Sequence, residues 1–331
     1  MLNDELKLAQ NIFDKPAEAP TRDGFGKALL ELGETEPRVV VLCADLAEST
    51  RALAFKEKYP ERYIELGVAE QNLATVASGL ANYGKIPFIA SYATFSPGRN
   101  NEQIRTTISL NNVPVKIMGM HAGVSVGPDG ATHQALEDIA LMRVQPNMTV
   151  VSPCDAEEAR KAIHAAAEYA GPVYVRFGRE KTPIMTTADT PFELGKANVL
   201  WTPESGDKPQ TAIFATGPLV YQSLCAARQL EKDGIAVSVV NMHTIKPLDR
   251  DTVVTEARAA GAVVTVEEHQ IAGGFGSTIA EALAQECPLP LEFVGVLDRF
   301  GQSGTPNELL KEYGMDTQSI IAAVKKVIAR K

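Results

Sequence analysis

Short apolar runs alternate with amphipathic stretches from about Thr21 onward, and this alternation dominates the chain. Runs rich in Val, Ile and Phe that are bounded by Gly, Pro, Asp or Asn predict buried strands. The first half contains RVVVLCAD, RYIELG, KIPFIASY, VPVKIMGMH, NMTVVSP and PVYVRFG. Helical patterns lie between them, notably NNEQIRTTISL, ALEDIALMRV and DAEEARKAIHAAAEYA. Such alternation predicts a parallel sheet with helices on both faces.

The rhythm breaks in a proline-containing stretch from Glu180 to Gln210, which we expect to be a linker. It resumes with the strand candidates TAIFATG, IAVSVVNM, GAVVTVEEH and LEFVGVL, and ends in a helical pattern near Thr317 to Ala329. A chain of 331 residues is long enough for two hydrophobic cores. We therefore predict an α/β fold of two doubly wound domains, residues 1–188 and 189–331.

Composition narrows the class of protein. Hydrophobic residues make up 45% of the chain and charged residues 22%, which is typical of a globular protein. The net charge of -9 argues against general binding to nucleic acid or to anionic membranes, so an anionic substrate would need locally placed basic residues. The four cysteines are scattered, and neither a signal peptide nor a membrane-spanning run is recognisable. We expect a cytoplasmic protein with reduced thiols.

Chemically versatile side chains follow the predicted strands of the first domain at their carboxyl ends, where open α/β sheets bind ligands. These residues are Asp45, Ser49, Glu70, Tyr92, Phe95, His121 and Arg176. Arg176 and Arg22 would be surface cations by default, but the guanidinium group is also well suited to holding phosphate. Phe95 would be a core residue by default.

Glu70 opens a helical pattern that is otherwise small and apolar. Acidic residues are common in a first helical turn, where they complement the helix dipole. Between Tyr63 and Gly84, however, the only charged residues are Glu65 and Glu70, and no Lys or Arg is present to pair with them. A buried carboxylate without a cation nearby suits a group that handles protons.

The loop HAGVSVGPDGATHQ, from His121 to Gln134, is too long for a simple turn. It contains two of the five histidines of the chain and one acidic residue. A purely structural alternative has a turn at Asp129-Gly130 and a helix cap at Thr132 or His133. No zinc-type spacing and no G-x-S-x-G sequence are present, and AGGFGSTIAEAL is a weak match to a dinucleotide loop.

Taken together, these segments resemble the transketolase family of thiamine diphosphate enzymes, over nearly the whole chain but only its pyrimidine-binding and C-terminal domains. The resemblance rests on GVAEQNLATVASGL, SYATFSPGRNNEQIR, HAGVSVGPDGATHQALEDIALMR, NMTVVSPCDAEEA and VEEHQIAGGFGS. It implies a pyrimidine-binding thiamine diphosphate fold followed by a transketolase C-terminal domain. The implied reaction moves a two-carbon ketol unit from a ketose phosphate to an aldose phosphate.

The resemblance also implies roles for individual residues. Glu70 would bond the aminopyrimidine ring of thiamine diphosphate, and Phe95, Tyr92 and Asp45 would complete the cofactor pocket. His133 would assist proton transfer on the sugar, and Asp129 would bond a substrate hydroxyl. The sugar phosphate would be held by Arg22, Ser49, His121 and Arg176.

One expected part of the family pattern is missing. The family binds the cofactor diphosphate through Mg²⁺ (or Ca²⁺) at a G-D-G motif of its N-terminal domain, and GPDG here belongs to the loop already described. No metal site is therefore expected in this chain. The resemblance implies one subunit of a split transketolase, working with a separate diphosphate-binding subunit in an α2β2 heterotetramer.

Three alternatives remain open. The chain also resembles the C-terminal half of a 1-deoxy-D-xylulose-5-phosphate synthase, although His121 favours transketolase. The beta subunit of a 2-oxoacid dehydrogenase is a second alternative, and HAGVSVGPDGATHQ argues against it. A subunit that kept the fold and lost the chemistry is the third; such a subunit would tolerate loss of the Glu70 carboxylate.

Overall fold

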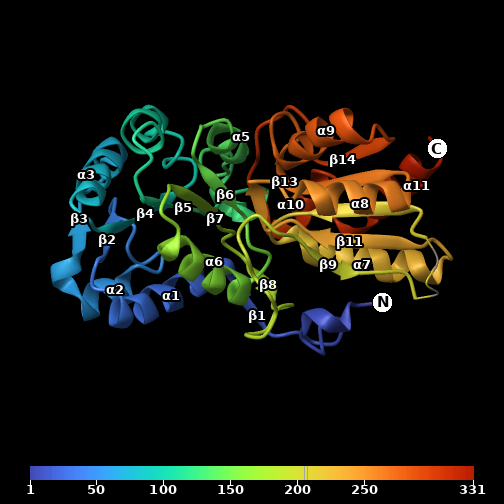
Figure 1. The fold of residues 1–331 in the computed structure, drawn as a ribbon, viewed down its shortest axis with the longest axis horizontal. Coiled ribbons are helices and arrows are strands. Elements are labelled where there is room, and N and C mark those ends of the chain that lie inside the picture. Colours follow the sequence, from blue (N-terminus) through green and yellow to red (C-terminus); the bar gives the residue numbers. More distant parts are fainter. Residues whose placement is uncertain (205, 207) are drawn as a thin grey trace.

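The computed structural model describes residues 1–204, 206 and 208–331 and has two α/β halves side by side (Figure 1). The first half is built on a seven-stranded sheet in the order β12-β6-β7-β5-β4-β2-β3. All neighbours in it are parallel except β12 against β6. The strands are β2 (Val39–Cys43), β3 (Tyr63–Glu65), β4 (Ile86–Tyr92), β5 (Lys116–Met120), β6 (Thr149–Val151), β7 (Val173–Arg176) and β12 (Thr244–Lys246).

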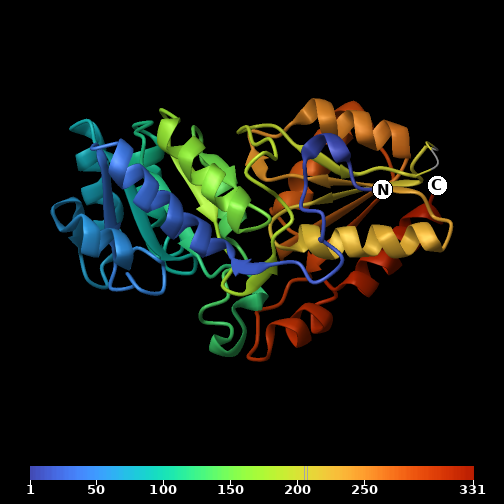
Figure 2. The same ribbon diagram turned by 90° about the horizontal axis from the view of Figure 1, so that it is seen from below.

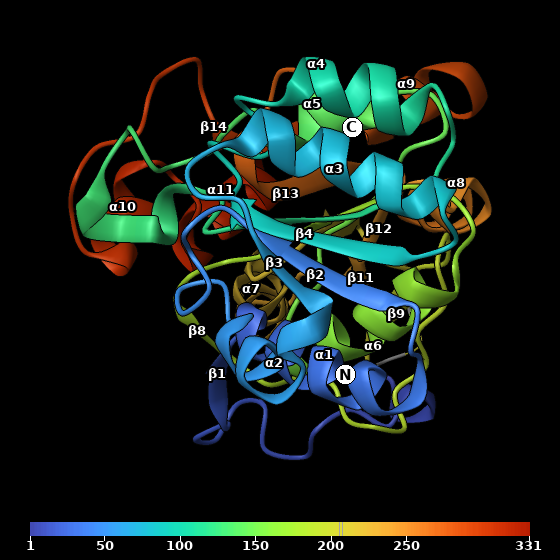
Figure 3. The same ribbon diagram turned by 90° about the vertical axis from the view of Figure 1, so that its left-hand side faces the viewer.

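Helices cover both faces of this sheet, as the alternation of sequence patterns predicts (Figure 3). On one face lie α1 (Thr21–Thr35), α2 (Leu53–Lys58) and α6 (Ala156–Glu168). On the other lie α3 (Glu70–Asn82), α4 (Asn101–Gln103), the π-helical turn η3 (Ile104–Ser109) and α5 (Asp138–Arg143). Strand β2 is buried at every position, which is why it appears in the sequence as a continuous apolar run. Strand β5 is equally buried, including Lys116 at its start.

The second half contains a five-stranded sheet in the order β14-β13-β10-β11-β9. Its strands are β9 (Asn198–Trp201), β10 (Thr211–Ala215), β11 (Val237–Asn241), β13 (Val263–Gln270) and β14 (Leu291–Val296). Its helices are α7 (Leu219–Lys232), α8 (Arg250–Ala260), α9 (Phe275–Glu286), α10 (Pro306–Glu312) and α11 (Thr317–Ile328). One apolar cluster runs through both halves, from Leu73 and Ile117 to Phe214 and Phe275.

The two halves are also joined by segments that cross between them. β12 follows β11 in the chain but pairs with β6 of the first sheet, Thr244 opposite Val151. The N-terminal segment, which includes η1 (Asp4–Leu6), lies along the second half (Figure 2). There Asn3 N donates to Leu200 O at 2.9 Å, and Phe13 meets Trp201 edge to face. The first residues thus pack on the second half.

The stretch expected to be a linker, residues 180–210, carries two strands. β8 (Lys181–Pro183) pairs antiparallel with β1 (Glu18–Pro20), and β9 extends the second sheet. That part of the prediction was wrong, because strands this short next to prolines show no periodicity. Residues 205 and 207 of the stretch lie outside the described part of the chain. In that described part, no helix has both the length and the apolarity needed to cross a membrane.

Candidate active site

Most of the predicted site residues lie at the carboxyl ends of β2, β3, β4 and β5. From β2 the chain moves to β3 on one side and then crosses to β4 on the other, so the strand order reverses between β2 and β4. Such a switch point is where open α/β sheets form a ligand crevice. Asp45, Arg51 and His121 have φ values of 60°, 69° and 55°, in the left-handed region that side chains rarely adopt. Backbone strain of this kind is concentrated at functional sites.

Glu70 is the first residue of α3 and is only 1% exposed. The expectation that it lacks a cationic partner was wrong. Arg99 Nη1 donates to Glu70 Oε2 at 2.8 Å, from the loop after β4. The partner lies 29 residues further along the chain, which is why the residues around Glu70 give no sign of it. Asn100 Nδ2 donates to Glu70 O at 2.9 Å and ties the same loop to the start of α3.

A row of rings extends from Glu70 toward the end of β5. The Arg99 guanidinium lies 5.1 Å from the centre of the Phe95 ring, and Phe95 and Tyr92 are 6.0 Å apart and nearly parallel. Tyr92 in turn stacks on His121 at 4.2 Å. His133 presents its edge to both aromatic rings, at 5.5 Å from Phe95 and 6.0 Å from Tyr92. Four predicted residues therefore form one continuous surface.

The far end of this row is a cluster of positive charge. Arg22 Nη1 donates to the backbone carbonyl of Ser49 at 2.8 Å and lies 2.7 Å from His121 Nε2. Because an arginine can only donate, His121 Nε2 is the acceptor and the ring proton lies on Nδ1. That Nδ1 is buried and has no hydrogen-bond partner among the described residues. The ring N–H of His121 is therefore a buried donor without an acceptor among the described residues.

Burial and charge repulsion both act on this cluster. Burial, followed by the charges of Arg22, Arg179 and Arg51, lowers the pKa of His121 to about 3. Burial also lowers the pKa of Arg22, and the nearby Arg51 and Arg179 lower it further. Asp23 compensates part of this charge, since it pairs with Arg51 at 2.7 Å and raises the pKa of Arg22. An anion placed between the arginines would relieve the repulsion that remains. The cluster has the charge expected of a phosphate-binding site.

Arg179, which the sequence reasoning missed, lies near Arg22 and His121, where Arg176 was expected. Arg176 is only 5% exposed, and its Nε donates to Asp138 Oδ2 at 2.8 Å. Its Nη2 donates to Glu268 O of the second half, also at 2.8 Å. In the structure Arg176 is a buried link between the two halves, whereas the sequence reasoning expected it to hold the sugar phosphate. The second arginine of VRFGR was the available signal, because it lies beyond the strand and not within it.

Arg179 also organises the loop from His121 to Gln134. It forms an ion pair with Asp129 at 3.2 Å and donates to Val126 O at 2.9 Å, within the 3₁₀ turn η4 (Val124–Asp129). Figure 2 shows this loop beside α10 of the second half, and Gly127 lies against Pro306. The loop that carries Asp129 and His133 is thus held by both halves of the molecule.

Glu65 is a second residue that the sequence reasoning did not assign to the site. Its Oε1 accepts hydrogen bonds from Asp45 N at 2.8 Å and Gly67 N at 3.1 Å, and Tyr63 Oη donates to its Oε2 at 2.7 Å. Burial raises the pKa of Glu65, but the bonds to Asp45 and Tyr63 outweigh burial and lower it. The carboxylate thus fixes the loops that present Asp45, which is exposed, and Glu70.

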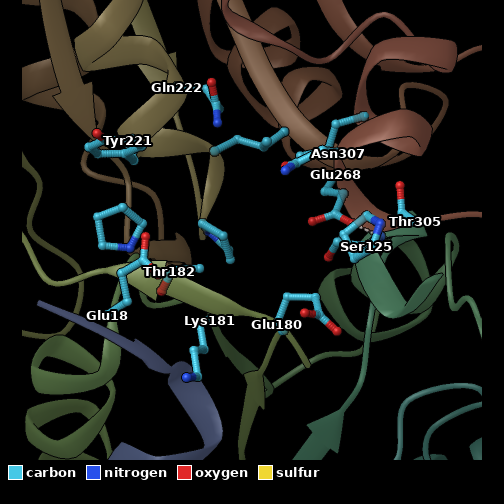
Figure 4. Close-up of a pocket in the computed structure, with 16 residues that line it drawn as sticks. Glu18, Ser125, Glu180, Lys181, Thr182, Tyr221, Gln222, Glu268, Thr305 and Asn307 are labelled. Atoms are coloured by element: carbon cyan, nitrogen blue, oxygen red, sulfur yellow. Dashed lines mark hydrogen bonds between the residues drawn. The ribbon is translucent and has the colours of Figure 1, made fainter. Parts of the chain in front are cut away.

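An interdomain cavity of about 520 Å³ lies elsewhere, behind η4 (Figure 4). Ser125, Glu180, Glu268, Thr305 and Asn307 are among its lining residues, and none of the ten predicted site residues is. The acidic side chains that line this cavity do not indicate a particular ligand. Among the described residues, no group of three or more His, Cys, Asp or Glu side chains is placed to hold a metal ion.

The fold and the row of residues define an α/β protein in which a buried carboxylate and a series of rings lie next to a cluster of arginines. Two family models match the chain: the transketolase pyrimidine-binding domain over residues 17–185 and the transketolase C-terminal domain over residues 202–320. The chain belongs to the transketolase family and corresponds to these two domains.

Individual relatives agree with the family models. The chain is 43% identical to a putative transketolase C-terminal section of Methanocaldococcus jannaschii, over 90% of this chain and 93% of that protein. It is 38% identical to a 6-deoxy-6-sulfo-D-fructose transketolase subunit of a Clostridium species, over 94% of this chain and 95% of that protein. A solved split-gene transketolase, described as an inactive beta4 tetramer, is 46% identical, with a TM-score of 0.86 over 94% of this chain and 98% of that one.

Proposed function

We propose that the chain is the C-terminal subunit of a split transketolase, which transfers a two-carbon ketol unit between sugar phosphates with thiamine diphosphate. The observation that carries the proposal is the row from Glu70 through Phe95 and Tyr92 to the cluster around Arg22. It joins a pocket suited to an aminopyrimidine with a site suited to a phosphate. A substrate bound by its phosphate at one end would therefore reach the cofactor with its other end.

The residues present fit thiamine diphosphate on grounds internal to this structure. Glu70 is a nearly fully buried carboxylate whose outward oxygen bonds a nitrogen donor, and the Phe95 ring is faced by the same planar cation. An aminopyrimidine offers the same combination, a nitrogen donor on a flat ring. When bound, the cofactor would supply the electron sink for breaking and forming the carbon–carbon bond.

The residues of this chain would then orient the substrate and move protons. Glu70 would hold the ring nitrogen that it bonds in the protonated form, and Phe95 would fix the ring plane. His133, at the edge of Phe95, would exchange a proton with the sugar, and Asp129 would accept a hydrogen bond from a sugar hydroxyl. Arg22, His121 and Arg179 would hold the phosphate, with Ser49 shaping the site through its carbonyl.

A partner subunit is part of the proposal. The matched family models are the pyrimidine-binding and C-terminal domains, and the pocket is open on one side, where Asp45 and Val68 are exposed. We propose that a diphosphate-binding subunit covers this side, supplies the Mg²⁺ (or Ca²⁺) site and forms a heterotetramer. The solved relative described as an inactive beta4 tetramer supports this arrangement, since copies of that chain alone assemble without activity.

The experiment measures glyceraldehyde 3-phosphate release from xylulose 5-phosphate with ribose 5-phosphate, thiamine diphosphate and Mg²⁺. It is run with this chain alone and with its diphosphate-binding partner. Activity only in the mixture supports the proposal, and activity of the chain alone refutes the need for a partner. Pyruvate consumption in place of ketol transfer would indicate the synthase or the dehydrogenase.

The identity of the donor sugar requires a separate experiment. One relative is named for a sulfonated fructose, and a cluster of three arginines suits a sulfonate as well as a phosphate. Running 6-deoxy-6-sulfofructose against fructose 6-phosphate as donors in the same assay assigns the anion that the cluster prefers.

A further inference from the structure

Arg99 makes the same two contacts that the proposed function gives to the cofactor ring. Its Nη1 donates to Glu70 Oε2 at 2.8 Å, and its guanidinium lies 5.1 Å from the centre of the Phe95 ring. One face of the Phe95 ring cannot be covered by two planar groups at once, and Arg99 already lies over that ring while bonding Glu70. The arginine side chain and an aminopyrimidine would therefore compete for one position.

The backbone that carries Arg99 is held firmly. Arg99 N donates to Phe95 O at 2.8 Å, and Asn100 Nδ2 bonds both Glu70 O and Ser96 Oγ. Gly98 has no room for a side chain, because a Cβ atom there would lie 1.9 Å from Thr94 O. The loop itself is thus not free to withdraw from the pocket.

The side chain of Arg99, in contrast, is 51% exposed. Among the described residues, it donates one side-chain hydrogen bond, to Glu70. A long cation with one hydrogen bond and solvent around it leaves its partner at low cost. Glu70 does not have this freedom, because a buried carboxylate is costly unless something neutralises it.

We propose that Arg99 is a placeholder for the cofactor ring. It neutralises Glu70 and covers Phe95 when no aminopyrimidine is bound, and it turns into solvent when the ring arrives. The inference rests on the proposed function, because it needs thiamine diphosphate as the incoming group. Its consequence is a lowered apparent affinity, since part of the binding free energy is spent on displacing the arginine.

The test is the dissociation constant of thiamine diphosphate with Mg²⁺ for the complex of this chain and its diphosphate-binding partner, measured by titration calorimetry. Arg99→Met removes the competing cation and should tighten binding by up to about fivefold. Arg99→Lys keeps the charge but loses the planar contact with Phe95. Its affinity for thiamine diphosphate should therefore lie between those of the unmodified protein and Arg99→Met. Arg105→Met is the matched control: Arg105 is an exposed arginine of the same segment, and its substitution should leave the affinity unchanged.

A second readout needs no cofactor. In this chain alone, Arg99→Met should lower the denaturant midpoint because Glu70 is left unpaired, and Glu70→Gln in the same chain should restore most of the loss. Unchanged or weaker cofactor binding by both Arg99 variants would overturn the placeholder, since it would make Arg99 a bystander or a cofactor ligand. Failure of the unmodified complex to bind thiamine diphosphate would instead refute the proposed function, and the inference with it.

Discussion

The side-chain amide of Gln134 donates a hydrogen bond to the backbone carbonyl of Gln302 at 3.0 Å, 168 residues further along the chain. The same Nε2 also donates to Val124 O at 3.0 Å, so one buried amide ties the start of the loop from His121 to Gln134 to the second half of the molecule. His133 is the neighbouring residue. The C-terminal domain thereby takes part in positioning a proposed proton-transfer group.

Gly301→Ala tests this link. A Cβ atom at Gly301 would lie 1.7 Å from Gln134 Oε1, so the amide must move. We expect a higher KM for the phosphorylated donor and a loss of about 1–3 kcal/mol in the free energy of unfolding, as for other overpacked sites. Gly79→Ala is the control, because a Cβ atom there meets nothing within 4 Å and the position lies inside α3. It should leave KM unchanged and raise stability by roughly 0.5–1 kcal/mol.

The two arginines of VRFGR should respond differently to removal. Arg179→Met takes one cation from the proposed phosphate site and should raise KM about 10- to 100-fold while the protein stays folded. Arg176→Met leaves Asp138 buried without its cation and should lower the free energy of unfolding by about 3–5 kcal/mol. Steady-state kinetics and urea denaturation of both variants distinguish the roles. The reverse result would return the phosphate site to Arg176.

Removing the carboxylate of Glu70 while keeping its shape tests the chemistry. Glu70→Gln should lower kcat of the assembled enzyme by about 10²- to 10⁴-fold, the range typical of a lost proton-handling group. Glu102→Gln changes an exposed carboxylate of the adjacent segment and should have no effect. Retention of activity by Glu70→Gln would support the alternative of a catalytically silent subunit.

Protonation of three buried histidines should contribute to unfolding below about pH 6.5. Burial lowers the pKa of His121 and His243 to about 3 and that of His269 to about 4. The unfolded chain binds these protons below pH 6.5, whereas the folded chain does so only near pH 3 to 4. The histidine contribution to stability is therefore lost as pH falls through this window, by up to about 1.4 kcal/mol per pH unit for each histidine. The buried carboxyls of Glu158 and Glu267, whose pKa burial raises to about 7 and about 8, act in the opposite direction in the upper part of the window.

His243→Phe isolates one contribution to the acid effect. The ring stacks on Phe192 at 4.3 Å, and its Nε2 is buried without a partner among the described residues. Asp249 and Lys161 are the charged groups that act on it, in opposite directions. A phenyl ring keeps the stack and cannot be protonated, so acid unfolding should begin at a lower pH. An unchanged midpoint in a pH titration followed by circular dichroism would show that His243 does not contribute.

How much could be predicted from sequence depended on how local each signal was. The long buried strands, such as β4 and β13, and the amphipathic α6 follow from periodicity. Tyr92 and His121 lie at the carboxyl ends of β4 and β5, as predicted. β12 and β8 could not be predicted, because strands of three residues are stabilised by partners far away in the chain. The ion pair of Glu70 with Arg99 was hidden for the same reason.

The burial of Arg176 could not be predicted for a different physical reason. A strand in the middle of a sheet is buried on both faces, and a charged residue at its end can be inside or outside the protein. Whether Arg176 points into the interface depends on Asp138 and on the carbonyl of Glu268, which the fold alone brings together. Only the three-dimensional arrangement decides between the two arginines.

The position of β12 constrains how this architecture can evolve. The edge of the first sheet is supplied by residues 244–246, which follow strand β11 of the second sheet in the chain. A gene rearrangement that exchanged either domain alone would deliver a first sheet with a bare edge next to β6. The pair is thus expected to be inherited as one block, and a split of an ancestral gene is tolerated only outside this block.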